Sequence, residues 1–342
     1  GYWQIHLAKD AKERTAFSTP EGLFQYTVLP FGLHGAHATF QHLMHKLLWP
    51  HTSYAAAYLD DVVIHTPDWE THLEKVEAVL HMLRRAGLTA NPVKCAIGLA
   101  EAKYLGYIVG RGMVKPQLNK LEAIQNWPRP NRKKQVRAFL AVVGYYRRFI
   151  PHFTTRASSL TDLIKARGPD MVKWTGAAEK AFMDLRTALC SNPVLIAPDF
   201  KKEFILQTDA SEVGLGAVLL QMVGDEEHPI LYLSRKLLLR EQKYAMVERE
   251  CLAVKWAMET LRYYLLVRRF TLVTDHAPLQ WMQRNKEKNA RVTRWLLFLQ
   301  PFQFTIQYQA GSHHGNADGL SQVHCLTSQV AQPHGVEQGG DL

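Results

Sequence analysis

The stretch YAAAYLDDVVIHT, from Tyr54 to Thr66, places two adjacent aspartates between two apolar runs. Each run has the length and residue types of a β-strand, which predicts a hairpin that bends at Asp60 and Asp61. A buried carboxylate without a partner costs several kcal/mol, neighbouring carboxylates repel each other, and the stretch contains no Lys or Arg. We therefore predict that Asp60 and Asp61 bind a divalent cation. The alternative is an ordinary surface turn, where Asp is common.

Length and charge narrow the class of protein further. The 342 residues are too many for one ordinary hydrophobic core, so we expect two or more domains. No window of about 18 uncharged apolar residues predicts a membrane span. The net charge of +10 suggests a polyanionic partner. The four cysteines are far apart and form no CxxC pair, which is typical of a reduced, intracellular protein without a structural zinc site.

A second group of acids lies in the C-terminal half. From about residue 200 the pattern predicts three strands, a helix, a strand, a helix, a strand and a short final helix. Asp209 ends the first strand and Asp275 ends the fourth, so both would emerge at the same end of the sheet if the strands are neighbours. Glu250 lies near the start of the long helix, and Asp318 lies near the start of the last one. The alternative for each of these four acids is an ordinary turn or cap residue. Glu248, two residues before Glu250, is expected to lie on a solvated helix face.

Such a cluster of four carboxylates would be strongly repulsive when empty. Two Mg²⁺ ions roughly 3.5–4 Å apart would neutralise it and would suit in-line attack of water on a phosphodiester. We therefore predict that Asp209, Glu250, Asp275 and Asp318 are catalytic metal ligands.

The order of the short motifs suggests a family. LPFGL, ATFQ, YLDD, KYLGYIV, VVGYYRRFIPHF, TDAS, TDHAPLQW and GNADGLS follow one another along the chain. This series resembles the reverse transcriptase–RNase H region of Gypsy-type (Metaviridae) LTR retrotransposon Pol polyproteins, over roughly residues 1–322. The resemblance implies an α/β and α+β multidomain chain, with a right-hand polymerase followed by an RNase H-like mixed five-stranded sheet with helices. Its parts would be partial fingers and palm in 1–114, a helical thumb in 115–168, a connection in 169–199 and the RNase H-like domain in 200–322. The tail 323–342, rich in Gln, Gly and His, is expected to be disordered.

The resemblance also implies roles for individual residues. Asp60 and Asp61 would be two of three palm carboxylates that hold two Mg²⁺ at the primer 3′ end. The residues expected at the nucleotide and template site are Tyr2, Phe31, Gly32 and Gln41, with Tyr2 under the incoming sugar. The residues expected to contact the primer or its phosphates are Leu105, Gly106, Arg137, Arg147 and Arg148. For the three arginines a solvated helix face is an equal alternative.

Several positions depart from the family pattern. The family's first palm aspartate lies shortly before the position of Tyr2 and would precede Gly1, so we expect that the chain as given cannot polymerise DNA unaided. Gly35-Ala36-His37 replaces Asn-Ala-Pro, which would loosen the template-side loop. Gly319 replaces Ala and would weaken the last helix and the aim of Asp318. His313 or His314 could be the mobile histidine of many RNases H, although a solvated loop is the favoured alternative.

These expectations favour a retroelement enzyme whose RNase H part cuts the RNA strand of RNA–DNA hybrids with Mg²⁺, for which Mn²⁺ can substitute. Its partners would be the hybrid, a DNA primer on an RNA template and the remainder of a Pol polyprotein, in cytoplasmic particles or the nucleus. One alternative is a non-catalytic nucleic-acid-binding relic or host-adopted copy. Another is a structural subunit that pairs with a full-length copy, since the oligomeric state is open.

Overall fold

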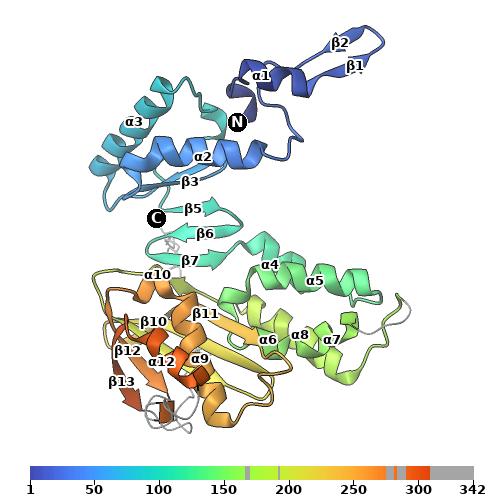
Figure 1. Cartoon of the computed structure of the whole chain (residues 1–342). Helices are drawn as coiled ribbons and strands as arrows, with labels where there is room; N and C mark the ends of the chain where they lie inside the picture. The colour runs from blue at the N-terminus through green and yellow to red at the C-terminus, as the bar shows by residue number, and fades with distance from the viewer. Residues whose placement is uncertain (166–169, 192, 275–280, 283–289, 309–342) are drawn as a thin grey trace, which may run out of the picture. The chain divides into compact units, whose positions relative to one another are not determined.

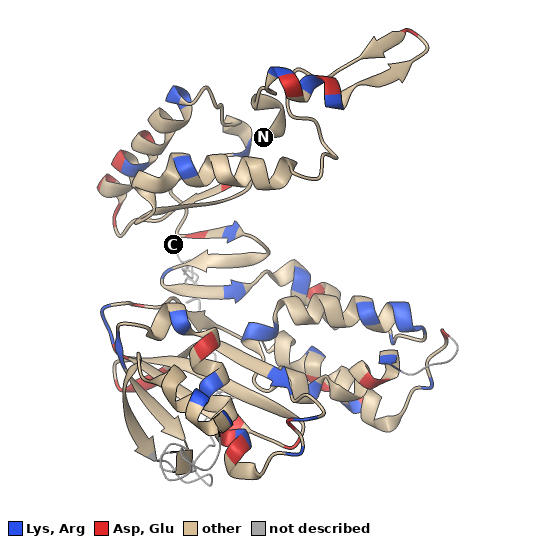
Figure 2. Cartoon of the chain, viewed as in Figure 1, with Lys and Arg blue, Asp and Glu red and all other residues tan. Residues whose placement is uncertain are grey.

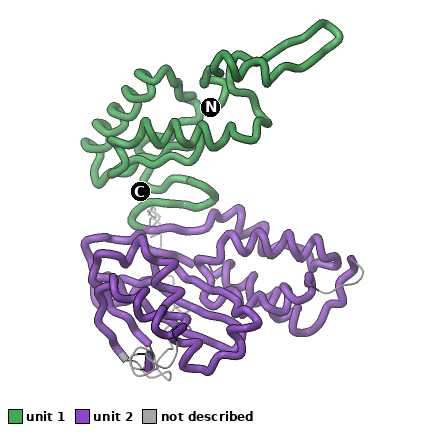
Figure 3. Tube along the Cα trace, in the orientation of Figure 1, with its two compact units in different colours: residues 1–112 green, residues 113–342 purple. Residues whose placement is uncertain are grey.

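A computed structural model describes residues 1–165, 170–191, 193–274, 281–282 and 290–308 (Figure 1). The chain divides into two compact units, Gly1–Gly112 and Met113–Leu342 (Figure 3), and each is described by itself. Within the described ranges, no helix combines the length and the apolar character needed to cross a membrane.

The first unit alternates short helices with hairpins. Its elements are η1 (Tyr2–Gln4), α1 (Lys9–Lys12), η2 (Glu13–Thr15), β1 (Phe17–Thr19), β2 (Gly22–Phe24), α2 (Ala36–Leu48), η3 (Trp49–His51), β3 (Ala55–Tyr58), β4 (Asp61–Ile64), α3 (Trp69–Arg85), η4 (Pro92–Lys94), β5 (Glu101–Tyr104) and β6 (Tyr107–Gly110). Strands β3 and β4 pair antiparallel with Tyr58 opposite Asp61, so the predicted hairpin is confirmed.

The core of this unit follows from the period of helix α2. Phe40, Met44 and Leu48 recur every four residues, which places them on one helix face, and all three are buried. They pack with Ala55 of β3 and Val79 of α3. Helix α2 therefore lies against the hairpin that carries Asp60 and Asp61.

The second unit begins with a mainly helical part that lies between two short strands in the sequence. Its elements are β7 (Met113–Pro116), α4 (Leu118–Gln125), α5 (Lys133–Tyr145), η5 (Arg147–Phe149), α6 (Phe153–Arg156), α7 (Ser158–Lys165), α8 (Gly176–Cys190) and β8 (Leu195–Ile196). Helical spacing predicts one apolar face of α5 formed by Val136, Phe139, Leu140 and Val143; Val136, Phe139 and Val143 are buried, whereas Leu140 is half-buried. The ring of Phe139 lies 4.6 Å from that of Phe182 in α8, centroid to centroid, which joins these two helices.

A five-stranded sheet with helices follows and confirms the predicted RNase H-like architecture. Its elements are β9 (Phe204–Ala210), β10 (Gly214–Val223), β11 (Glu226–Lys236), α9 (Met246–Thr260), α10 (Arg262–Leu265), β12 (Arg269–Thr274), α12 (Ala290–Leu299) and β13 (Gln303–Tyr308). The strand order is β11-β10-β9-β12-β13. The sheet is mixed, because β10 runs antiparallel to β9 and β11 whereas β12 runs parallel to β9 and β13.

The core of this sheet lies under helices α9 and α12, which Figure 1 shows together on one face. Cys251, Val254 and Met258 follow helical spacing along α9 and are fully buried in the same cluster as Phe204 and Leu206 of β9. Helix α9 therefore lies directly beside β9, and this packing brings Glu250 to the strand that carries Asp209.

Candidate active sites

The first candidate site is the turn of the β3–β4 hairpin. Leu59 and Asp60 form the turn, and Asp61 is the first residue of β4. Both aspartates are exposed, and the Asp60 side chain keeps 65% of its accessible surface. The expectation of buried carboxylates is therefore wrong: a hairpin turn projects beyond its strands, so water can solvate both charges. Exposed, adjacent carboxylate oxygens remain suitable ligands for a hard divalent cation.

Gln41 of α2 binds the backbone of this turn through two hydrogen bonds. Its Nε2 donates to the Ala57 carbonyl oxygen at 3.0 Å, and its Oε1 accepts from the Leu59 backbone N–H at 2.6 Å. Leu59 has a φ of 54°, a left-handed conformation that is uncommon for a side chain of this kind. Gln41 therefore stabilises the backbone next to Asp60, a contact that its ATFQ motif did not by itself reveal.

An aromatic cluster lies beside the turn. The ring of Tyr2 packs edge-on against Phe31 and Phe40, with centroid distances of 5.5 and 5.3 Å. Gly1, the neighbour of Tyr2, has its amino nitrogen 3.9 Å from Asp60 Oδ2. Tyr2 therefore directly follows the residue that lies near Asp60, and Phe31, which packs on Tyr2, remains 67% exposed.

The segment from Gly32 to His37 leads from this cluster into α2. Gly32 has a φ of 92°, which favours glycine at this bend. The His37 ring lies 5.3 Å from the Tyr2 ring, centroid to centroid, and α2 begins at Ala36.

The β5–β6 hairpin belongs to the same unit as the two aspartates. Leu105 and Gly106 form its two-residue turn, with φ values of 45° and 76° that are typical of a type I′ turn. Burial raises the pKa of the adjacent Tyr104, and the negative charge of Asp61 adds to this effect. The charge of Asp61 therefore acts on the residue that precedes this turn.

The arginines of the second unit lie on its helical part. Arg137 of α5 and Arg147 of η5 are exposed, and Arg148 is half-buried. Figure 2 shows further basic positions, coloured blue, along the ribbons of α4 and α5. Lys120 belongs to α4, and Lys133 and Lys134 belong to α5. This surface has the charge needed to bind phosphates.

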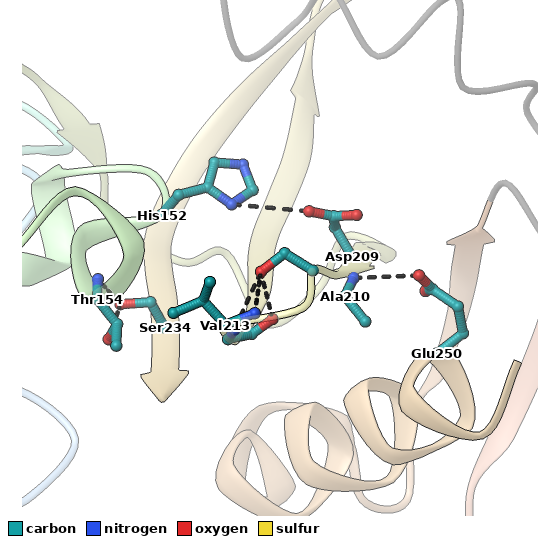
Figure 4. Close-up of polar contacts among 9 residues, drawn as sticks. His152, Thr154, Asp209, Ala210, Val213, Ser234 and Glu250 are labelled. Carbon is teal, nitrogen blue, oxygen red and sulfur yellow. Dashed lines mark hydrogen bonds and ion pairs between the residues drawn. The ribbon is translucent and has the colours of Figure 1, made fainter. Parts of the chain in front are cut away.

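The second candidate site is at the end of strand β9. The Asp209 side chain is about half exposed, whereas Glu250 of α9 is completely buried. Glu250 Oε1 accepts the backbone N–H of Ala210, the residue after Asp209, at 3.2 Å (Figure 4). The structure therefore brings these two predicted ligands to one place.

Glu250 also affects the pKa of the adjacent Cys251. Burial raises the pKa of Cys251 to about 12, and the negative charges of Glu250 and Glu248 contribute to the shift. A carboxylate held in such a poorly solvated position is stabilised by a nearby cation.

Glu248 is not the solvated residue that its sequence position predicts. Its Oε2 accepts the Ala245 backbone N–H at 3.1 Å, and its Oε1 pairs with Arg291 of α12. Only 16% of its side chain is exposed. The expectation is wrong because the residue caps the start of α9 while facing a basic residue distant in sequence.

The remaining predicted ligands, Asp275 and Asp318, lie outside the described residues, as do His313, His314 and Gly319. Among the described residues, no group of three or more His, Cys, Asp or Glu side chains could hold a metal ion. The fit of a metal to the second site therefore rests on the pair Asp209 and Glu250. Their oxygen donors, one buried and one accessible from solvent, suit a hard divalent cation.

The sheet, its paired acids and the separate aspartate hairpin define the class: a reverse transcriptase joined to an RNase H-like domain. Residues 1–109 match the family described as reverse transcriptase (RNA-dependent DNA polymerase). Residues 199–302 match the RNase H-like domain found in reverse transcriptase. Enzymes of both kinds use divalent metal ions.

Curated relatives identify the family. The retrovirus-related Pol polyprotein from transposon 297 of Drosophila melanogaster is 39% identical over 324 residues, which are 94% of this chain and 30% of that protein. The transposon Tf2-3 polyprotein of Schizosaccharomyces pombe is 34% identical over 328 residues, 94% of this chain and 24% of that protein. The chain belongs to the retrotransposon Pol polyproteins, and it spans about a third or less of these relatives' length.

Solved structures show the same fold. The foamy viral protease-reverse transcriptase in complex with RNA/DNA hybrid superposes with a TM-score of 0.77 at 20% identity, covering all of this chain and 45% of that one. The foamy viral protease-reverse transcriptase dRH in complex with double-stranded DNA gives a TM-score of 0.80 at 22% identity, covering 90% of this chain and 55% of that one.

Proposed function

We propose that this chain is the reverse transcriptase–RNase H segment of a Gypsy-type Pol polyprotein and that its RNase H part hydrolyses the RNA strand of RNA–DNA hybrids. The observation that carries the proposal is the hydrogen bond from the backbone N–H of Ala210, the residue after Asp209, to Glu250, within the sheet that matches the RNase H-like family. The hybrid bound by the foamy viral relative supports this substrate class. The wide minor groove of a hybrid would present the RNA 2′-hydroxyls by which RNA is told from DNA.

The ligands proposed for two Mg²⁺ ions are Asp209, Glu250, Asp275 and Asp318, and Mn²⁺ would substitute. When bound, such ions lower the pKa of an attacking water and stabilise charge on the phosphate. The chain's own contribution is orientation: the Ala210 N–H fixes the Glu250 carboxylate beside Asp209. Glu250 is buried in surroundings of low dielectric constant, where a carboxylate attracts a cation more strongly than it does in water.

For the first unit we propose the family's polymerase geometry. Asp60 and Asp61 would bind divalent metal at a primer 3′ end, with Tyr2 below the incoming sugar. The other proposed contacts are Phe31, Gly32 and Gln41 to nucleotide and template, Leu105 and Gly106 to primer, and Arg137, Arg147 and Arg148 to phosphates. The exposure of the aspartates and their proximity to the aromatic cluster support this arrangement.

The test is cleavage of a hybrid labelled on its RNA strand, in Mg²⁺, by the unmodified chain and by Asp209→Asn. Asp225→Asn is the matched control, because Asp225 is an exposed acid in the β10–β11 turn, at the other end of β10 from Asp209. Metal-dependent cleavage that survives only in the control supports the proposal. Hybrid binding without cleavage by the unmodified chain would instead favour a non-catalytic nucleic-acid-binding protein.

A further inference from the structure

A histidine from outside the RNase H-like match reaches the second candidate site. His152 lies between η5 and α6, before the matched residues 199–302 begin. Its Nδ1 is 3.8 Å from Asp209 Oδ2, and both side chains are about half exposed (Figure 4). No sequence motif assigned this residue a role at the site.

The backbone of His152 is adapted to this position. It has φ 50° and ψ 32°, a left-handed conformation that few residues adopt readily. That conformation occurs directly before α6, where the chain changes direction, and Figure 4 shows the ring pointing toward Asp209.

The sheet leaves space for the imidazole ring. Gly216 of β10 lies opposite Asp209 in the antiparallel register. A Cβ at Gly216 would lie 3.0 Å from His152 Nδ1 and 3.2 Å from its Cε1, closer than almost all ordinary contacts. The glycine therefore permits His152 to lie over the strand pair beside the carboxylate.

A neighbouring contact fixes the segment to the sheet. Ser234 of β11 lies opposite Gly216, so Asp209, Gly216 and Ser234 form one row across three strands. The Thr154 N–H donates to Ser234 Oγ at 3.0 Å, and the two hydroxyls are 2.9 Å apart. His152 lies at the Asp209 end of this row, and Thr154 binds Ser234 at the other end. The segment is therefore attached to the sheet at two points, and this keeps the imidazole ring near Asp209.

We propose that His152 is a positioning residue of the RNase H site: its imidazole Nδ1–H donates to Asp209 Oδ2 and leaves the other carboxylate oxygen for a divalent cation. The proposal rests on the RNase H function proposed above. The 3.8 Å separation is longer than a direct hydrogen bond, so the contact closes by a small ring rotation or through one water molecule. Carboxylates that bind metal are commonly oriented by such hydrogen bonds, and their loss typically costs about 10–100-fold in metal affinity or activity.

The experiment compares His152→Gly with His152→Asn in the full chain. Glycine keeps the left-handed backbone and removes the ring, whereas asparagine also tolerates this conformation and offers an N–H in place of Nδ1. His228→Asn is the matched control, since it removes an imidazole that lies 3.5 Å from Glu226 near the β10–β11 turn. Mn²⁺ binding to the protein without nucleic acid is measured by calorimetry, and the site is identified as the one that Asp209→Asn removes.

We expect His152→Gly to weaken Mn²⁺ at that site about 10–100-fold and to raise the Mg²⁺ concentration for half-maximal cleavage similarly. The rate at saturating Mg²⁺ changes much less, His152→Asn restores most of the affinity, and His228→Asn has no effect. Unchanged Mn²⁺ affinity in His152→Gly would overturn the proposal. It would also be overturned if both His152 variants lost Mn²⁺ affinity and melted at a lower temperature, because the residue would then act only on stability. If Asp209→Asn removes no Mn²⁺ site and the unmodified chain does not cleave, the proposed function itself fails.

Discussion

The side chain of Gln41 accepts the backbone N–H of Leu59 at 2.6 Å, and this bond holds the turn that carries Asp60 in a left-handed conformation. A second bond, from Gln41 to the Ala57 carbonyl, fixes the strand before the turn. Helix α2 and the aspartate hairpin are therefore joined by polar contacts as well as by their apolar core.

Replacement of Gln41 by Leu should destabilise the first unit by about 1–3 kcal/mol, because two hydrogen bonds are lost and their backbone partners become partly unsatisfied. Urea unfolding followed by circular dichroism measures the change. Leu59→Gly in the same background should recover part of it, since glycine adopts a positive φ without strain. An unchanged unfolding midpoint in Gln41→Leu would show that the turn needs no support from α2.

Glu248→Ala should cost about 1–3 kcal/mol of stability, because it removes both the cap at Ala245 and the pair with Arg291. Glu248→Gln should cost less, since an amide oxygen can still accept the Ala245 N–H. Thermal unfolding of the three proteins provides the comparison. Equal losses in the two variants would mean that the cap contributes little beside the ion pair.

Cys251 should stay protonated and unreactive at pH 8, because its pKa is raised to about 12. Alkylation by iodoacetamide, located by peptide mass spectrometry, should modify the exposed Cys95 and spare Cys251 in the folded chain. Rapid modification of Cys251 without unfolding would contradict the burial that raises its pKa.

The same shift predicts a pH dependence of stability. The folded-state pKa of Cys251 lies above the ordinary value of 9.0, so the protonated thiol favours the folded state. The contribution of the protonated thiol to the free energy of unfolding is fully present below about pH 9 and is lost as the pH rises toward 12. Cys251→Ala should flatten the decline of unfolding free energy over this range. Parallel curves for the two proteins would refute the effect.

Gly216→Ala should raise the Mg²⁺ concentration needed for hybrid cleavage, because the new methyl group displaces the His152 ring. The effect should resemble that of His152→Gly, and the double variant should be no worse than either single one. Gly176→Ala is the control, since a Cβ there meets open space. Additive effects in the double variant would show that Gly216 acts independently of His152.

Arg137→Gln should weaken hybrid binding equally for all sequences and reduce the slope of log affinity against log salt by about 1. Fluorescence anisotropy at several salt concentrations measures this slope. Arg262→Gln, at an exposed position of α10, is a control expected to leave the slope unchanged. An unaltered slope in Arg137→Gln would assign that arginine to a solvated face.

Local patterns predicted the parts of the fold that depend on nearby residues. The apolar runs on either side of Asp60 and Asp61 indicated a hairpin, and the spacing of Val136, Phe139 and Val143 indicated the buried face of α5. Both are confirmed, because strand and helix periods are properties of short segments. The same patterns were wrong about the burial of Asp60 and the exposure of Glu248, since exposure depends on what other segments cover.

The sequence by itself predicted the aspartate hairpin and the main helices, its resemblance to the family implied the mixed sheet, and its acids remain the proposed metal ligands. Only the tertiary structure decided which distant groups orient those acids: Gln41 at the first turn, Ala210 beside Glu250, and His152 beside Asp209. These contacts depend on strand register, as in the row formed by Asp209, Gly216 and Ser234, and on the packing of helices from other parts of the chain. Register and packing are set by the whole core at once, so no single motif encodes them.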